Sequence, residues 1–182
     1  STLIKILGQA GGSSLYELAW GRDYRDVITE HIEKSISASE TFDFDIDQQE
    51  EILKEYLRLT EKSAERMREK GLAANTISIK VRFSDFKTIS RSKTLDLPIN
   101  STQEIFEVVK NLYLALGLER VLIRLVSVSL DSLVENDDLQ QMVRGQRESG
   151  WSQADRAIDR IKQRFGRTSL RPARLVSKEN EE

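Results

Sequence analysis

One stretch, residues 76–95, constrains the fold of this chain more than any other. Its first arm alternates between apolar and polar side chains, which is the period of a strand buried on one face only. The second arm, 87–95, is more polar, and residues 84–86 are the predicted connection between the arms. The stretch therefore predicts a β-hairpin with one face on a core and one polar face. The apolar side of the first arm consists of Ile77, Ile79, Val81 and Phe83.

Capping residues and apolar periodicity place four further elements around this hairpin. Before it, residues 34–42 alternate as a strand, and 48–70 have the apolar stripe of a helix, with Asp47 as the predicted N-cap. After it, Ser101 opens a capping box for a second helix, and 120–130 is a fourth strand. The order β-α-β-β-α-β predicts an α+β fold, a four-stranded and mainly antiparallel sheet with both helices on one face. The other face of the sheet is predicted to be open.

Helices are also predicted at both ends of the chain. Residues 1–21 hold two short apolar patterns separated by Gly11 and Gly12, and two short helices cannot bury a core unaided. We therefore expect residues 1–26 to be the truncated end of a preceding domain. A helix capped by Ser152 carries an apolar stripe that we expect to dock on the sheet domain. This stripe consists of Trp151, Ala154, Ile158, Ile161 and Phe165.

Composition excludes several kinds of site. The chain has no cysteine, which rules out disulfides and thiolate chemistry, and its one histidine, His31, lies among charged neighbours. Asp43, Asp45 and Asp47 alternate as in a calcium loop, but Gln48 takes the place of the required glycine. We find no group of nucleophile, base and acid, and no apolar run that approaches the ~20 residues needed to cross a bilayer. We expect a cytoplasmic protein without a catalytic site of its own.

Basic residues gather in two places although the formal net charge is -2. The hairpin carries five lysines and arginines against one acidic residue, Asp85. Residues 144–174 carry nine basic residues against three acidic ones. Such asymmetry is typical of a chain that binds a polyanionic partner.

Taken in order, these segments resemble the C-terminal part of Y-family translesion DNA polymerases of the bacterial polymerase IV type. LGQAGGSSLYELAWGRDYRDV is similar to the end of that family's thumb domain, KSISASETF to the first strand of its little finger domain, and RLVSVSL to the last strand. ISIKVRFSDFKTISRSKTL is similar to the hairpin between them, and GWSQADRAIDRIKQRFGRTSLRPARLV to a C-terminal extension of actinobacterial members. The resemblance implies a division into 1–26 (thumb end), 27–32 (linker), 33–131 (little finger domain), 132–150 (loop), 151–176 (helical extension) and 177–182 (disordered tail).

The resemblance implies a function in error-prone lesion bypass during DNA repair. The little finger domain of this family grips double-stranded primer–template DNA through contacts to the DNA backbone, which carry no sequence information. The family's metal-binding carboxylates belong to its palm domain, to which nothing in this chain is similar. The resemblance therefore implies a parent nucleotidyltransferase that uses magnesium, and a fragment that is inactive alone, without catalytic residues, metal or cofactor. The residues that it implies in binding the DNA backbone are Ser35, Ser37, Ser39, Lys80, Arg82, Lys87, Ser90, Arg91, Ser92, Lys93 and Thr94.

Three places depart from the family's pattern. The family usually has an acidic residue near Ser39, and a basic residue where this chain has Glu33. Its members also carry a sliding-clamp peptide, and the matching segment here is degenerate, because Gln141 stands where leucine is preferred. Weak clamp binding and loss of the motif both stay open as alternatives. The segment consists of Leu139, Gln140, Gln141, Met142 and Val143.

A stand-alone split β-α-β interaction module is the alternative function. RNA-binding domains of that type stack bases on aromatic side chains of the sheet. The polar face of the hairpin offers hydroxyls and cations instead, so the sequence favours the polymerase interpretation.

Overall fold

The computed structural model describes residues 2–26, 33–135 and 150–175, which belong to two compact units, Ser1–Ile32 and Glu33–Glu182. The first unit contains α1 (Thr2–Ala19), two helices that join across a kink at Gly8, where the backbone φ is 77°. The sequence predicted this break at Gly11 and Gly12, and that prediction is wrong. Gly12 is buried, and a Cβ atom there would lie 2.5 Å from Cα of Ile4, so this glycine allows a close approach and does not end a helix.

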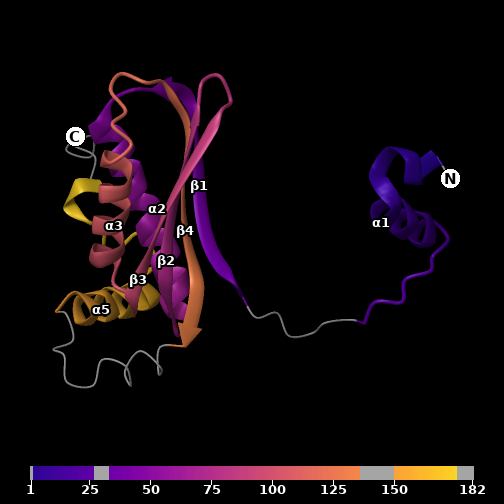
Figure 1. The fold of residues 1–182 in the computed structure, drawn as a ribbon. Helices are drawn as coiled ribbons and strands as arrows, with labels where there is room; N and C mark the ends of the chain where they lie inside the picture. The colour runs from indigo at the N-terminus through magenta and orange to yellow at the C-terminus, as the bar shows by residue number, and fades with distance from the viewer. Residues whose placement is uncertain (1, 27–32, 136–149, 176–182) are drawn as a thin grey trace. The chain divides into compact units, whose positions relative to one another are not determined.

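Residues 33–182 contain a four-stranded sheet whose spatial order is β1-β4-β2-β3. All three pairs of neighbouring strands are antiparallel. Figure 1 shows that α2 and α3 lie against one face of this sheet, while no described element of residues 33–182 covers its other face. The predicted α+β fold and the order β-α-β-β-α-β are therefore confirmed. In chain order the elements are β1 (Ser35–Ile46), α2 (Gln49–Glu69), β2 (Leu72–Phe83), β3 (Thr88–Ile99), α3 (Thr102–Leu114), β4 (Ile123–Glu135), α5 (Gly150–Phe165) and the 3₁₀ turn η1 (Ala173–Leu175).

The strands extend beyond their predicted ends, and the helix caps agree with prediction at one helix only. β1 continues past an irregularity to Ile46, and β4 continues to Glu135, because both run on as partners of neighbouring strands. Ser101 caps α3, and its side chain accepts a hydrogen bond from the backbone N–H of Glu104. The N-cap of α2 is Gln48, without a side-chain hydrogen bond, and not the predicted Asp47.

The core lies between the sheet and the two helices, and the predicted apolar faces meet there. Ile77, Ile79 and Val81 of β2 are buried against this layer. Tyr56 of α2 is fully buried, and its ring centroid lies 5.5 Å from that of Tyr113 in α3. Burial of this apolar surface holds the helices to one face of the sheet and leaves the other face free.

Ion pairs between partly buried side chains hold α5 against α2 and α3. Arg68 of α2 is 9% exposed and lies 2.7 Å from Asp159 and 3.5 Å from Asp155. Asp155 also accepts a hydrogen bond of 2.7 Å from the backbone N–H of Thr102. Lys162, 6% exposed, lies 2.5 Å from Glu61 and 3.3 Å from Glu65. We call these six charged side chains the α5 ion-pair cluster: Arg68, Asp155, Asp159, Lys162, Glu61 and Glu65.

The pKa of Lys162 shows which pH range favours this cluster. Burial lowers the pKa, but the hydrogen bond to Glu61 and the charges of Glu61 and Glu65 outweigh burial, so the pKa of Lys162 is raised. A raised lysine pKa contributes stability that is complete below the pKa of the unfolded chain, ~10.4, and that is lost as the pH rises through the folded value. The Lys162 contribution therefore persists through neutral pH.

The predicted apolar stripe contributes less to docking than expected. Trp151 is 56% exposed and Phe165 is 66% exposed, and Ile161 is exposed as well. Only Ala154 and Ile158 are half-buried. The stripe prediction is therefore wrong for three of its five residues, because the face that α5 presents to α2 is centred on its charged residues.

Arg68→Ala should lower the free energy of unfolding by about 3 kcal/mol, because it leaves two partly buried carboxylates without their cation. Phe165→Ala should change it by no more than about 0.5 kcal/mol, since the ring is mostly in solvent. Urea unfolding of the two variants and the parent measures both values. Equal losses in the two variants would mean that apolar contacts, and not the α5 ion-pair cluster, hold the helix.

Candidate functional site

The uncovered face of the sheet is the candidate functional site, and strand register determines which side chains it presents. Residues directly opposite each other in an antiparallel pair point to the same face, and neighbours along a strand point to opposite faces. Since Ile77 and Ile79 point to the helices, the residues of β2 that alternate with them, such as Ser78 and Lys80, point to the uncovered face. Four rows of partners cross this face from β1 to β3: Ser35–Asp131–Thr76–Thr94, Ser37–Ser129–Ser78–Ser92, Ser39–Ser127–Lys80–Ser90 and Thr41–Leu125–Arg82–Thr88.

We call these four rows together the hydroxyl face, because short hydroxyl side chains dominate it. Twelve of its sixteen residues are serine or threonine, and none is aromatic. Its two cations, Lys80 and Arg82, lie on β2 toward the hairpin turn. Its one carboxylate, Asp131, lies at the other end. A surface of this kind offers hydrogen-bond donors close to the backbone, with positive charge at one end.

Local contacts hold the two cationic positions in place. Nε of Arg82 donates a hydrogen bond of 3.1 Å to the hydroxyl of Thr88, its partner across the hairpin. The hydroxyl of Tyr56 donates a hydrogen bond of 3.2 Å to the backbone carbonyl of Lys80 from the helix side. Among the ion pairs that the described residues form, none includes Lys80 or Arg82. Both charges are therefore available to an anion.

Arg91 and Lys93 lie on the opposite side of the sheet from the hydroxyl face. Arg91 is the partner of Ile79 and Lys93 is the partner of Ile77, so both side chains leave β3 on the helix side. They are exposed because β3 is an edge strand. The sequence grouped them with Ser90, Ser92 and Thr94, and the structure does not bring the two sets together on one face.

The predicted connection of the hairpin, residues 84–86, is confirmed. Its Asp85 forms an ion pair with Lys87. Phe86 has a left-handed backbone with φ of 64°, as a three-residue hairpin loop requires at its last position. Nζ of Lys87 lies 2.9 Å from Asp85. The hydrogen bond from Lys87 lowers the pKa of Asp85, and the same bond raises the pKa of Lys87. Within the part of the chain that the structure describes, Lys87 is therefore the one hairpin cation with a carboxylate partner.

Eight of the sixteen residues of the hydroxyl face were not among the predicted DNA-binding residues, and Asp131 is the only charged one of these eight. Its two carboxylate oxygens accept hydrogen bonds from the hydroxyls of Ser78, at 2.9 Å, and Ser129, at 2.8 Å. The predicted last strand ended at residue 130, so Asp131 lay outside it. The alternation of Ser127 and Ser129 continues to Asp131 and was the signal that could have placed it.

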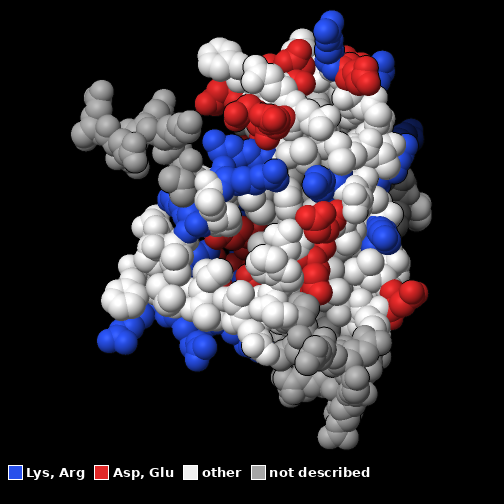
Figure 2. Space-filling model, turned by 90° about the vertical axis from the view of Figure 1, so that its left-hand side faces the viewer, with Lys and Arg blue, Asp and Glu red and all other residues white. Residues whose placement is uncertain are grey.

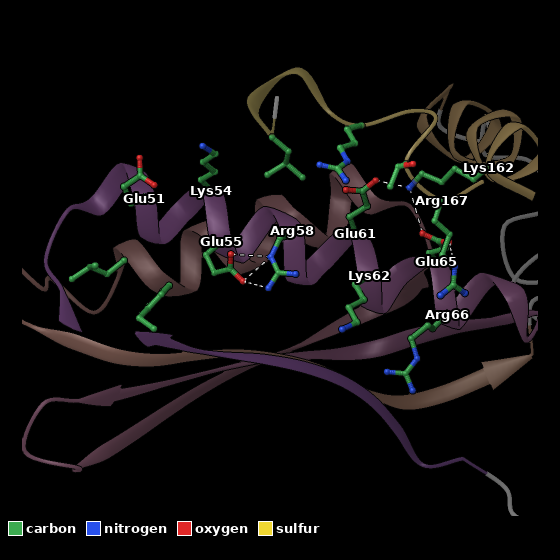
Figure 3. Close-up of a pocket in the computed structure, with 15 residues that line it drawn as sticks. Glu51, Lys54, Glu55, Arg58, Glu61, Lys62, Glu65, Arg66, Lys162 and Arg167 are labelled. Carbon is green, nitrogen blue, oxygen red and sulfur yellow. Dashed lines mark hydrogen bonds and ion pairs between the residues drawn. The ribbon is translucent and has the colours of Figure 1, made fainter. Parts of the chain in front are cut away.

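A hollow of about 750 Å³ follows the outer side of α2, and seven basic and four acidic residues line it. Figure 3 shows cations and carboxylates of α2 interleaved along it, with Lys162 and Arg167 approaching from the C-terminal segment. Arg58 donates to Glu55 at 2.6 Å, and Arg167 lies 3.5 Å from Glu65. Figure 2 shows the same mixture of blue and red over the helix side. Three cations of this hollow, Arg58, Lys162 and Arg167, are thus held by glutamates, whereas none of the ion pairs between described residues holds Lys80 or Arg82.

Several sequence predictions concern other parts of the chain. The candidate clamp segment, Leu139 to Val143, lies outside the described residues. Within the described ranges, no three or more His, Cys, Asp or Glu side chains form a group that could hold a metal ion. No described helix combines the length and the apolar character needed to cross a bilayer.

Comparison with known families and proteins finds similarity over most of residues 33–182, and in some relatives over most of the chain. Residues 33–143 match the C-terminal domain of the impB/mucB/samB family. DNA polymerase IV of Streptomyces coelicolor is 38% identical over 110 residues, which cover 60% of this chain and 23% of that protein. DNA polymerase IV 2 of Mesorhizobium japonicum is 32% identical over 182 residues, 92% of this chain and 44% of that protein. The chain thus spans less than half the length of these relatives.

Solved structures give a weaker likeness. A structure described as the post-insertion binary complex of Dbh DNA polymerase matches with a TM-score of 0.49 and 20% identity, over 75% of this chain and 39% of that one. A Y-family DNA polymerase chimera of Dbh and Dpo4 also gives 0.49, with 22% identity, over 74% and 38%. The sequence matches therefore carry the family assignment. The actinobacterial character of the C-terminal extension stays a prediction.

Tyr56→Phe should lower the free energy of unfolding by about 1 kcal/mol, because it removes the hydroxyl that supports the Lys80 carbonyl. Tyr113→Phe is the matched control, since no hydrogen bond of its hydroxyl is found within the described residues, and we expect a smaller loss. Urea unfolding monitored by circular dichroism gives both values. A larger loss for Tyr113→Phe would show that the contact to Lys80 does not anchor β2.

Proposed function

Since the chain belongs to the impB/mucB/samB family through its C-terminal domain, the little finger region of Y-family DNA polymerases, we propose that it binds double-stranded primer–template DNA during translesion synthesis. The surface that makes this contact is the hydroxyl face. Its role is to hold the polymerase on duplex DNA while a damaged template passes. The synthesis itself, which is error-prone and part of DNA repair, belongs to the whole enzyme.

One observation carries this proposal: the hydroxyl face combines short hydroxyls with two cations, Lys80 and Arg82, for which the described residues supply no ion-pair partner. Short side chains allow phosphates to approach the hydroxyl donors, and Lys80 and Arg82 supply the charge. Contacts to phosphates fix a protein on a duplex without reading its bases. A polymerase that must accept damaged and unrelated templates needs a contact of this kind.

The alternative, a stand-alone module that binds single-stranded RNA or DNA, is not favoured. Such modules stack bases on aromatic side chains. The four rows of the hydroxyl face contain no phenylalanine, tyrosine or tryptophan. The relatives identified by sequence are DNA polymerases IV.

The remaining properties follow from the proposed role in a larger enzyme. The resemblance implies a magnesium-dependent nucleotidyltransferase, but the described residues supply no metal-binding group, so no step of this proposal uses a metal. We infer that catalysis and its magnesium belong to other residues of the whole polymerase. We place that polymerase in the cytoplasm, where bacterial DNA lies. Sliding-clamp binding through residues 139–143 is a second, separate proposal that rests on the sequence resemblance.

Replacing Lys80 and Arg82 with alanine should weaken binding to duplex DNA and flatten its salt dependence. Each phosphate contact releases condensed counterions and contributes roughly 0.9 to the slope of log affinity against log salt, so the double variant should lose roughly 2 from this slope. The loss should be the same for unrelated duplex sequences. Fluorescence anisotropy with labelled duplexes, at several salt concentrations, measures the slope.

The Arg91→Ala, Lys93→Ala double variant is the matched control. It removes the same charge from the same hairpin, but from the opposite side of the sheet. We expect it to keep most of the parent's slope. If the control flattens the slope as much as the Lys80 and Arg82 pair does, general electrostatics and not the hydroxyl face attracts the DNA.

The chain alone should show no primer extension at any magnesium concentration, because its described residues contain no group of carboxylates that could hold the metal. A gel assay with labelled primer, all four nucleotides and highly purified protein measures extension. Extension that co-purifies with the chain would contradict the assignment of catalysis to other residues.

A further inference from the structure

Asp131 is the one residue of the hydroxyl face whose charge opposes the proposed ligand. β4 is an interior strand, so Asp131 lies within the face and not at its rim. Its neighbours in the row are Ser35, Thr76 and Thr94. It is half-buried, and no cation among the described residues forms an ion pair with it. A phosphate laid over this row would meet an unneutralised carboxylate.

The carboxylate is also held in place. Each oxygen accepts a hydrogen bond from a serine of the next row, Ser78 or Ser129. Those two hydroxyl protons point at Asp131, so they are not available to donate to a phosphate. The residue after it, Ser132, has a left-handed backbone with φ of 52°, an uncommon conformation for a residue other than glycine. Asp131 therefore alters two rows of the face, its own and that of Ser78.

The spacing of the rows separates this carboxylate from the cations. Lys80 is four residues along β2 from Thr76, the partner of Asp131, which is ~14 Å at ~3.4 Å per residue. Arg82 is six residues away, ~20 Å. Both distances exceed the Debye length of ~8 Å at physiological ionic strength. Asp131 therefore does not neutralise the cations, and it acts on whatever lies over its own end of the face.

We infer that Asp131 marks the end of the phosphate-binding track. This inference rests on the proposed function and defines its footprint. The DNA backbone crosses the rows of Lys80 and Arg82, and the rows of Ser78 and Thr76 face a part of the duplex other than its phosphates. Asp131 is a positioning residue, because repulsion from its carboxylate confines the backbone to the hairpin end of the sheet.

Asp131→Asn tests this inference, because it removes the charge and keeps the size of the side chain. Duplex affinity should rise up to about fivefold at low salt, the upper range for one exposed charge interaction. The gain should shrink between about 50 and about 200 mM salt, because salt screens the repulsion. Anisotropy with a labelled duplex measures both effects. Asp131→Ser is a second neutral variant, in case asparagine disturbs the contacts to the two serines.

Glu107→Gln is the matched control, since it removes one negative charge from the exposed side of α3, on the helix layer. It should leave duplex affinity within twofold of the parent value. If both neutral variants at position 131 behave like this control, the inference is overturned. Melting temperatures of the three variants confirm that each is folded.

The salt slope of the Lys80→Ala, Arg82→Ala variant distinguishes a failure of the proposed DNA-binding face from a failure of the boundary at Asp131. A flattened slope together with an unchanged affinity of the Asp131 variants keeps the DNA-binding face and overturns the boundary. An unchanged slope overturns the proposed function, and the boundary with it.

Discussion

The pairing of β2 with β4 on one side and β3 on the other decides which side chains of the sheet meet the helices. Ile77, Ile79 and Val81 fix one face of β2 in the core, and register carries that choice to every strand. A shift of one residue in any pair would exchange the two faces of that strand. The hydroxyl face is therefore a consequence of burial on the other side of the sheet.

The sequence predicted the parts of this fold that alternating burial determines. The order of elements, the hairpin and its connection, and the Ser101 cap all follow from local patterns of apolar and capping residues. These patterns are strong because each buried strand and helix needs a continuous apolar side. The serines at positions 35, 37 and 39, which the resemblance implies in DNA binding, lie on the uncovered face because the predicted strand alternates in the same way.

The sequence failed where a residue's position depends on a partner far away in the chain. β3 has few apolar residues, so its own pattern does not show that Arg91 and Lys93 lie on the helix side; only its register with β2 does. Asp131 lies on the hydroxyl face because β4 continues past residue 130 as the partner of β2. α5 docks through Arg68 and Lys162, and an apolar stripe gives no indication of such ion pairs.

Single-cysteine protection tests the central claim, that DNA covers the hydroxyl face, most directly, because the chain has no native cysteine. Ser90→Cys, Arg91→Cys and Ser92→Cys place a thiol at consecutive positions of β3, and maleimide labelling rates with and without duplex DNA report which are covered. The account predicts protection at 90 and 92 and little at 91, a period of two residues. Equal protection at all three positions, or protection at 91 alone, would contradict it.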